Sequence, residues 1–179
     1  IYGAQKSLII TVLGGLSMLG GIILLSLATD TFSIQAMISK ASDIQNSPFF
    51  ILAMILFMIG AFTKSAQVPF YIWLPDAMEA PTPVSAYLHS ATMVKAGLYL
   101  IARITPIFAI SESWVWTITL VGLITLFWAS LNATKQHDLK GILAFSTVSQ
   151  LGMIMSMLGI GAVSYHYQGA NSQLYVAGF

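Results

Sequence analysis

Long runs without a charged side chain dominate this sequence. Residues 8–27, 113–134 and 141–161 contain no charged residue. A membrane-spanning helix needs about 20 mostly apolar residues, and each of these runs has that length. The runs do not alternate between apolar and polar residues, which argues against the strands of a membrane β-barrel. The sequence therefore predicts an all-α integral membrane protein.

Composition excludes several classes of protein. Charged residues make up 7% of the chain, compared with about 25% in an average soluble domain. The net charge of +1 provides no basic surface for nucleic acid, so no nucleic-acid partner is expected. The chain has no cysteine and no phosphate-binding or metalloprotease motif. We therefore expect no cofactor, and the composition excludes a water-soluble enzyme.

Hydropathy divides the chain into five expected spans within one membrane domain over residues 1–179, forming a helical bundle. The spans are 5–27, 48–75, 82–103, 113–132 and 139–161. We expect Pro106 to end the third span and residues 34–41 to form one amphipathic helix at the interface. Trp114 and Trp116 are expected in an aromatic belt. Because the sequence starts at Ile1 and ends in an apolar run, we interpret it as an internal part of a longer polypeptide.

Basic residues give a weak indication of orientation. With five spans, Lys6, Lys135 and Lys140 lie on one side of the membrane, whereas Lys40 and Arg103 lie on the other. The excess of positive charge places the first side in the cytoplasm.

Lys64 is the most informative residue, because it lies 16 residues into the second span. A lysine at the bilayer centre costs about 2.5–3.5 kcal/mol, unless its chain reaches the interface. Pro69 lacks an N–H and clashes with the carbonyl four residues back, so it should interrupt the helix near Lys64–Pro69. Interrupted helices within a membrane are tolerated where they are packed in protein or line a wet cavity, and Gln67 adds an amide there. This combination favours a hydrated ion path over a snorkelling lysine.

The third and fifth spans each carry a polar face. At 100° per residue, five polar residues of the third span fall within an arc of about 120°. They are Ser85, His89, Thr92, Lys95 and Tyr99. His89 alone would usually be a structural histidine, but its position on a face with Lys95 favours proton transfer. In the fifth span Lys140, Thr147 and Gln150 share an arc of about 80°, although Lys140 is also where an ordinary positive-inside lysine would lie.

The acidic residues do not match these lysines in depth. All six Asp and Glu residues lie at or beyond the ends of the expected spans. A buried amine without a counter-charge readily loses its proton. Lys64 and Lys95 are therefore expected either to be neutral part of the time or to pair with a carboxylate outside these 179 residues. Both possibilities suit proton transfer.

Two stretches carry a family resemblance. Residues 64–97 include Lys64-Ser65-Ala66-Gln67-Val68-Pro69 and a Trp-Leu-Pro-Asp-Ala-Met-Glu-Ala-Pro-Thr-Pro loop, and residues 138–152 begin Asp-Leu-Lys-Gly-Ile-Leu-Ala-Phe-Ser-Thr. The chain resembles the proton-antiporter domain shared by the large membrane subunits of respiratory complex I and the Mrp-type multisubunit Na⁺/H⁺ antiporters. The loop and Lys95 are most similar to the A subunits of the Mrp branch.

The resemblance implies more than the residues alone show. It implies a secondary transporter rather than an enzyme, namely a subunit of a Na⁺/H⁺ antiporter in a bacterial plasma membrane, assembled with other membrane subunits. The residue matching Lys64 pairs, in the family, with a glutamate on an earlier helix that has no match here, and His89, Lys95 and Lys140 match a buried polar axis. Two alternatives remain open: a proton-pumping subunit of complex I, and a structural membrane scaffold with a vestigial polar axis.

Overall fold

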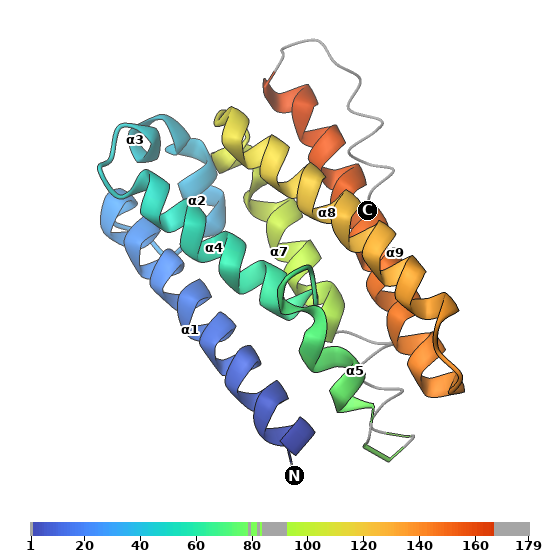
Figure 1. Ribbon diagram of the computed structural model, residues 1–179. Helices are drawn as coiled ribbons and strands as arrows, with labels where there is room; N and C mark the ends of the chain where they lie inside the picture. The colour runs from blue at the N-terminus through green and yellow to red at the C-terminus, as the bar shows by residue number, and fades with distance from the viewer. Residues whose placement is uncertain (1, 79, 82, 84–92, 167–179) are drawn as a thin grey trace.

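The computed structural model describes residues 2–78, 80–81, 83 and 93–166, and in this part of the chain helices are joined by short turns and loops (Figure 1). In chain order the helices are α1 (Tyr2–Thr29), α2 (Ile34–Ser39), α3 (Ala41–Gln45), α4 (Phe50–Lys64), the 3₁₀ turn η1 (Phe70–Ile72), α5 (Trp73–Ala77), α7 (Met93–Phe108), α8 (Glu112–Thr134) and α9 (Leu139–His166). The predicted all-α membrane bundle with a helix interrupted near Lys64–Pro69 is confirmed.

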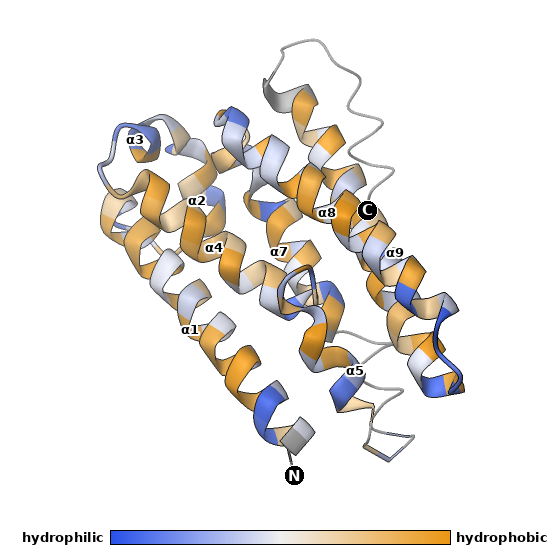
Figure 2. Ribbon diagram, in the orientation of Figure 1, coloured by the Kyte–Doolittle hydropathy of each residue, from blue (hydrophilic) through white to orange (hydrophobic). Residues whose placement is uncertain are grey.

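Three of these helices are long and apolar enough to cross a membrane, namely Gly3–Thr29 in α1, Glu112–Thr134 in α8 and Leu139–Val163 in α9. Orange apolar residues cover most of their length, and the blue polar residues concentrate towards their ends (Figure 2). By contrast α4 has 15 residues, which extend about 22 Å at 1.5 Å per residue. A hydrocarbon core is about 30 Å thick, so a helix of this length that enters at one face ends inside the membrane.

The long helices pack as two pairs, α1 with α4 and α8 with α9, and α7 contacts both α4 and α9. Glycine permits the closest approach in the second pair. A Cβ atom on Gly152 would lie 2.7 Å from the backbone nitrogen of Leu126 and 2.8 Å from the carbonyl oxygen of Gly122. The backbones of α8 and α9 are therefore in direct contact, as expected where small residues line a membrane interface.

Pro106 does not end α7, so that prediction is wrong: the helix continues to Phe108. The two residues after the proline-containing turn explain this, because Ile107 and Phe108 have no exposed surface. Burying each side chain contributes about 1.5–3 kcal/mol, which offsets the roughly 3 kcal/mol cost of an internal proline. Phe108 stacks on Trp114 with 4.9 Å between ring centroids.

The expectations for the 34–41 segment and for Trp114 also need correction. Residues 34–45 form two short helices instead of one, separated at Lys40, whose ammonium donates to the carbonyl of Thr29 over 3.1 Å. Met37 and Ile44 are buried, and both short helices contact α1 and α7. Trp114 is also buried and belongs to the core rather than to an aromatic belt.

Candidate functional site: an interrupted helix at mid-membrane

The interruption begins with a left-handed turn after α4. Ala66 has φ 49°, and the N–H of Gln67 donates to the carbonyl of Phe62 over 2.9 Å. This hydrogen bond spans five residues and satisfies one of the carbonyls that a helix end leaves without a partner. Alanine occupies the left-handed region at a cost that glycine avoids, about 1–2 kcal/mol. The helix is thus ended by its own capping turn before the chain reaches Pro69, which follows a cis peptide bond.

Two contacts hold the chain on the far side of the interruption. The indole Nε1 of Trp73 in α5 donates to the carbonyl oxygen of Thr63 over 2.8 Å. The backbone N–H of Val68 donates to Oγ1 of Thr125 over 3.0 Å. Sequence reasoning missed both contacts; Thr125 is one of several polar residues in an otherwise apolar span, and no local pattern connects it to a segment 57 residues away.

Thr125 also gives the depth of the interruption. It lies 13 residues after the start of α8 at Glu112 and nine before its end at Thr134. Since α8 is long enough to cross the membrane, its middle lies near the centre of the hydrocarbon core. The interruption therefore lies at mid-membrane, and Lys64, the last residue of α4, lies beside it.

Lys64 is half-buried, and no carboxylate in the described part of the chain pairs with it. Lys95 lies at a similar depth in the bundle to Lys64. A Cβ atom on Gly97 would lie 2.6 Å from the carbonyl oxygen of Ala61 and 3.1 Å from the backbone nitrogen of Ser65, so α7 contacts the end of α4 two residues after Lys95. Lys95 is exposed and likewise has no carboxylate partner among the described residues.

Gln67 is fully buried at the interruption. Its side-chain nitrogen donates to the carbonyl of Ser65 over 3.1 Å, whereas its oxygen, Oε1, has no hydrogen-bond partner. An unpaired buried acceptor costs about 1–3 kcal/mol. The interruption thus contains a polar group that the local fold does not satisfy.

Other predicted site residues are more dispersed. Tyr99 is exposed on α7, and Gln150 is exposed on α9. Thr147 is partly buried, and its hydroxyl donates to the carbonyl of Ala144 over 2.7 Å. Ser85, His89 and Thr92 lie outside the described residues.

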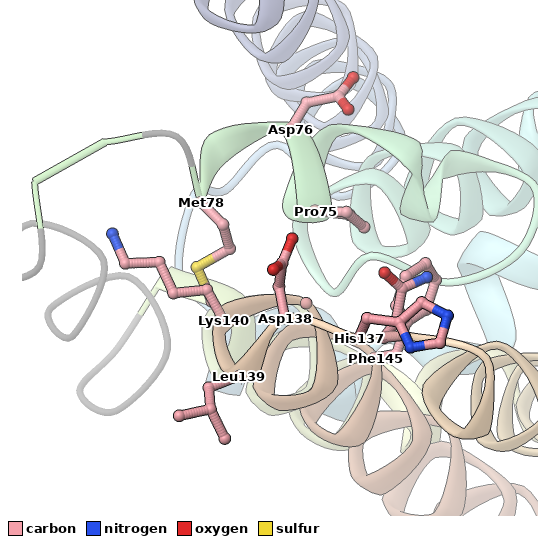
Figure 3. Close-up of a pocket in the computed structure, with 10 residues that line it drawn as sticks. Pro75, Asp76, Met78, His137, Asp138, Leu139, Lys140 and Phe145 are labelled. Atoms are coloured by element: carbon pink, nitrogen blue, oxygen red, sulfur yellow. The ribbon is translucent and has the colours of Figure 1, made fainter.

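Lys140 lies at one end of the bundle rather than at the interruption. It lines a cavity of about 690 Å³ between α5 and the start of α9, together with Asp76, His137 and Asp138. Figure 3 shows the Asp138 carboxylate directed towards α5 and Lys140 extended beside Met78. The ammonium of Lys140 donates to the carbonyl of Ala80 over 3.2 Å.

Although Asp76 lines this cavity, its carboxylate points away from Asp138 towards α1 (Figure 3), where its Oδ2 lies 2.8 Å from Nζ of Lys6. This ion pair places Lys6 and the end of α5 on the same side of the bundle, as the expected topology requires. Among the described residues no group of three His, Cys, Asp or Glu side chains is arranged to hold a metal ion.

Relatives that are named as antiporter subunits match the whole chain. Over all 179 residues the chain is 99% identical to Na(+)/H(+) antiporter subunit A1 of Staphylococcus epidermidis and 84% identical to the protein of the same name in Staphylococcus aureus. In each case the chain spans 22% of the relative's length.

Solved structures with the same fold include the Mrp complex from Dietzia sp. DQ12-45-1b. One chain of that complex matches with a TM-score of 0.82 and 37% identity, over 92% of this chain and 19% of that one. A chain of the membrane-bound sulfane sulfur reductase, an archaeal respiratory membrane complex, matches with a TM-score of 0.75 and 30% identity, over 91% of this chain and 36% of that one.

A family model covers almost the whole sequence. The model described as NADH:quinone oxidoreductase/Mrp antiporter, transmembrane, matches residues 1–178. Together with the apolar helices, this match makes the chain part of a multi-pass membrane protein. The chain belongs to the NADH:quinone oxidoreductase/Mrp antiporter family.

Proposed function

We propose that the chain is part of a subunit of a multisubunit antiporter that exchanges Na⁺ for H⁺ across a bacterial plasma membrane. The observation that carries this proposal is Lys64 beside a helix interruption at mid-membrane, without a carboxylate partner in the described part of the chain. Relatives named as Na⁺/H⁺ antiporter subunits favour this function over the complex I alternative.

Lys64 acts as the main proton carrier in this proposal. Its protonated form is costly at mid-membrane unless a negative charge lies nearby, by about 2.5–3.5 kcal/mol. A carboxylate on an earlier helix, outside these 179 residues, would stabilise the charged form when it approaches. Movement of that carboxylate or of a cation would then load or unload the lysine.

Lys95 and His89 extend the proton path from Lys64 along the third span expected from the sequence. Lys95 is well placed, because Gly97, two residues further on, contacts the end of α4. Thr92, Ser85, Gln67 and Tyr99 provide supporting hydrogen-bonding groups, as do Thr147 and Gln150 on α9. Lys140, in the cavity at the end of the bundle, passes protons on towards the next half-channel.

Replacing Lys64 tests the proposal directly. In everted membrane vesicles that contain the full-length subunit in its assembled complex, Lys64→Ala should abolish the Na⁺-dependent change in ΔpH. Lys135→Ala is the matched control, because Lys135 is exposed at the end of α8 and should tolerate the change. Normal exchange by an assembled Lys64→Ala complex would contradict the assignment, and exchange that requires NADH would favour the complex I alternative.

A further inference from the structure

A small apolar cavity lies between α2 and the helices α1, α4 and α7. Its volume is about 120 Å³, and every residue that lines it is apolar, among them Leu25, Phe57, Leu100 and Ile104. An apolar cavity of about 150 Å³ in another protein stays dry and binds benzene. The cavity is therefore suited to a short stretch of hydrocarbon, and not to water or an ion.

The cavity opens towards the loop that joins α1 to α2. Phe32 and Ile34 are the most exposed of its lining residues, and the side chain of Phe32 is 76% exposed. Leu25, Phe57 and Ile107 line its inner end and are buried. A continuous apolar path thus connects the surface of the bundle with the interior of the cavity.

The cavity lies at the depth of lipid acyl chains. Its residue Ile22 is seven residues before Thr29, the last residue of α1, and its residue Leu100 is eight residues before Phe108, the last residue of α7. At 1.5 Å per residue these separations are about 10 Å and 12 Å. Because α1 is long enough to cross the membrane, and a hydrocarbon core is about 30 Å thick, the cavity lies within one leaflet.

Lys40 is attached to the loop that forms the mouth of the cavity. Its ammonium donates to the carbonyl of Thr29, and this hydrogen bond closes the segment that contains Phe32. An ammonium has three donors, and neither Asp30 nor Asp43, the nearest carboxylates in the sequence, forms an ion pair with Lys40. Basic residues at the membrane surface attract lipid phosphate. A lipid whose chain enters the cavity would therefore have a cation available for its phosphate.

We propose that this cavity holds part of one acyl chain of a phospholipid whose phosphate pairs with Lys40. Acyl chains are the hydrocarbon that surrounds a membrane helix bundle at this depth. A side chain from another protein segment would fill the cavity without supplying the phosphate that Lys40 attracts. The site lies near the end of α7, away from the interruption, so it holds or fails independently of whether the protein exchanges Na⁺ for H⁺.

A photoreactive lipid tests the proposal in the full-length subunit within its assembled complex. The complex is reconstituted in nanodiscs of phosphatidylglycerol in which one acyl chain carries a diazirine near its middle. Illumination should label Ile104, which is 4% exposed and is reached only by a chain inside the cavity. Leu16 is 63% exposed on α1 and reports labelling by lipid at the outer surface. Mass spectrometry of the digested complex identifies the labelled residues.

Two neighbouring residues of α1 provide matched variants. Ile22 lines the cavity, whereas Ile23 is 45% exposed on the outer surface. Ile22→Phe places a larger side chain at the cavity and should lower the labelling of Ile104 several-fold relative to that of Leu16, whereas Ile23→Phe should leave this ratio unchanged. Two results would overturn the proposal: an unlabelled Ile104 beside a labelled Leu16, or the same ratio in both variants.

Lys40 provides a separate test of the phosphate. Lys40→Gln removes the cation, whereas Lys40→Arg keeps it. The ratio of labelling at Ile104 to labelling at Leu16 should therefore fall in Lys40→Gln and stay near the unsubstituted value in Lys40→Arg. Equal ratios in the two variants would overturn the pairing of the phosphate with Lys40.

Discussion

Adjacent glycines in α1 provide a controlled test of the packing around the interruption. A Cβ atom on Gly14 would overlap Oγ1 of Thr63 and lie 2.5 Å from its Cβ atom, whereas a Cβ atom on Gly15 would have no neighbour within 4 Å. Because the overlap includes the Cβ atom of Thr63, rotating that side chain cannot relieve it. Gly14→Ala must therefore separate α1 from the end of α4.

The two substitutions should change stability in opposite directions. Replacing glycine with alanine inside a helix stabilises it by roughly 0.5–1 kcal/mol at either position. Overpacking costs typically about 1–3 kcal/mol, and this cost applies to Gly14 alone. Gly14→Ala should therefore be less stable than Gly15→Ala by about 1–3 kcal/mol, because the propensity gain cancels in the comparison.

The measurement is the thermal midpoint of the purified full-length complex in detergent, followed by fluorescence-detected size exclusion. Gly14→Ala should lower the midpoint relative to Gly15→Ala. Indistinguishable midpoints would refute the close contact between α1 and the end of α4.

Three further substitutions test the contacts that hold the interruption. Thr125→Val removes the acceptor for the Val68 N–H and should destabilise the complex by about 1–3 kcal/mol. Thr125→Ser keeps the hydroxyl and should have little effect. Equal thermal midpoints for the two variants would contradict this hydrogen bond. Trp73→Phe keeps most of the buried ring but leaves a carbonyl of α4 unpaired, so its thermal midpoint should fall by an amount similar to that of Thr125→Val. Lys6→Gln should reduce stability by no more than about 1 kcal/mol, because the side chains of Lys6 and Asp76 are 29% and 33% exposed, and a larger loss would indicate additional partners.

Local sequence signals predicted the interruption itself. Lys64 and Pro69 lie within six residues of one another in an otherwise apolar run, and both disfavour a continuous membrane helix. The groups that hold the interruption could not be predicted in this way. Trp73 and Thr125 act across tertiary contacts, and their residue types occur commonly in membrane helices without such a role.

The errors have a common physical origin. Pro106, Trp114 and the amphipathic segment 34–41 each have a strong local structural preference, and burial in the bundle outweighed that preference in all three cases. Pro106 is retained in α7 because Ile107 and Phe108 are buried, and Trp114 is drawn into the core by stacking on Phe108. Sequence periodicity describes which face of a helix is apolar, but not which neighbour covers it.

The short α5 segment is fastened to three different helices. Its tryptophan binds the end of α4, the ion pair joins Asp76 to α1, and the linker before it binds the middle of α8. A rigid-body movement of this segment would have to break both hydrogen bonds and the ion pair at the same time. In the proposed antiport, ions that pass this point are therefore expected to move through rearranged side chains and water, while the backbone stays fixed.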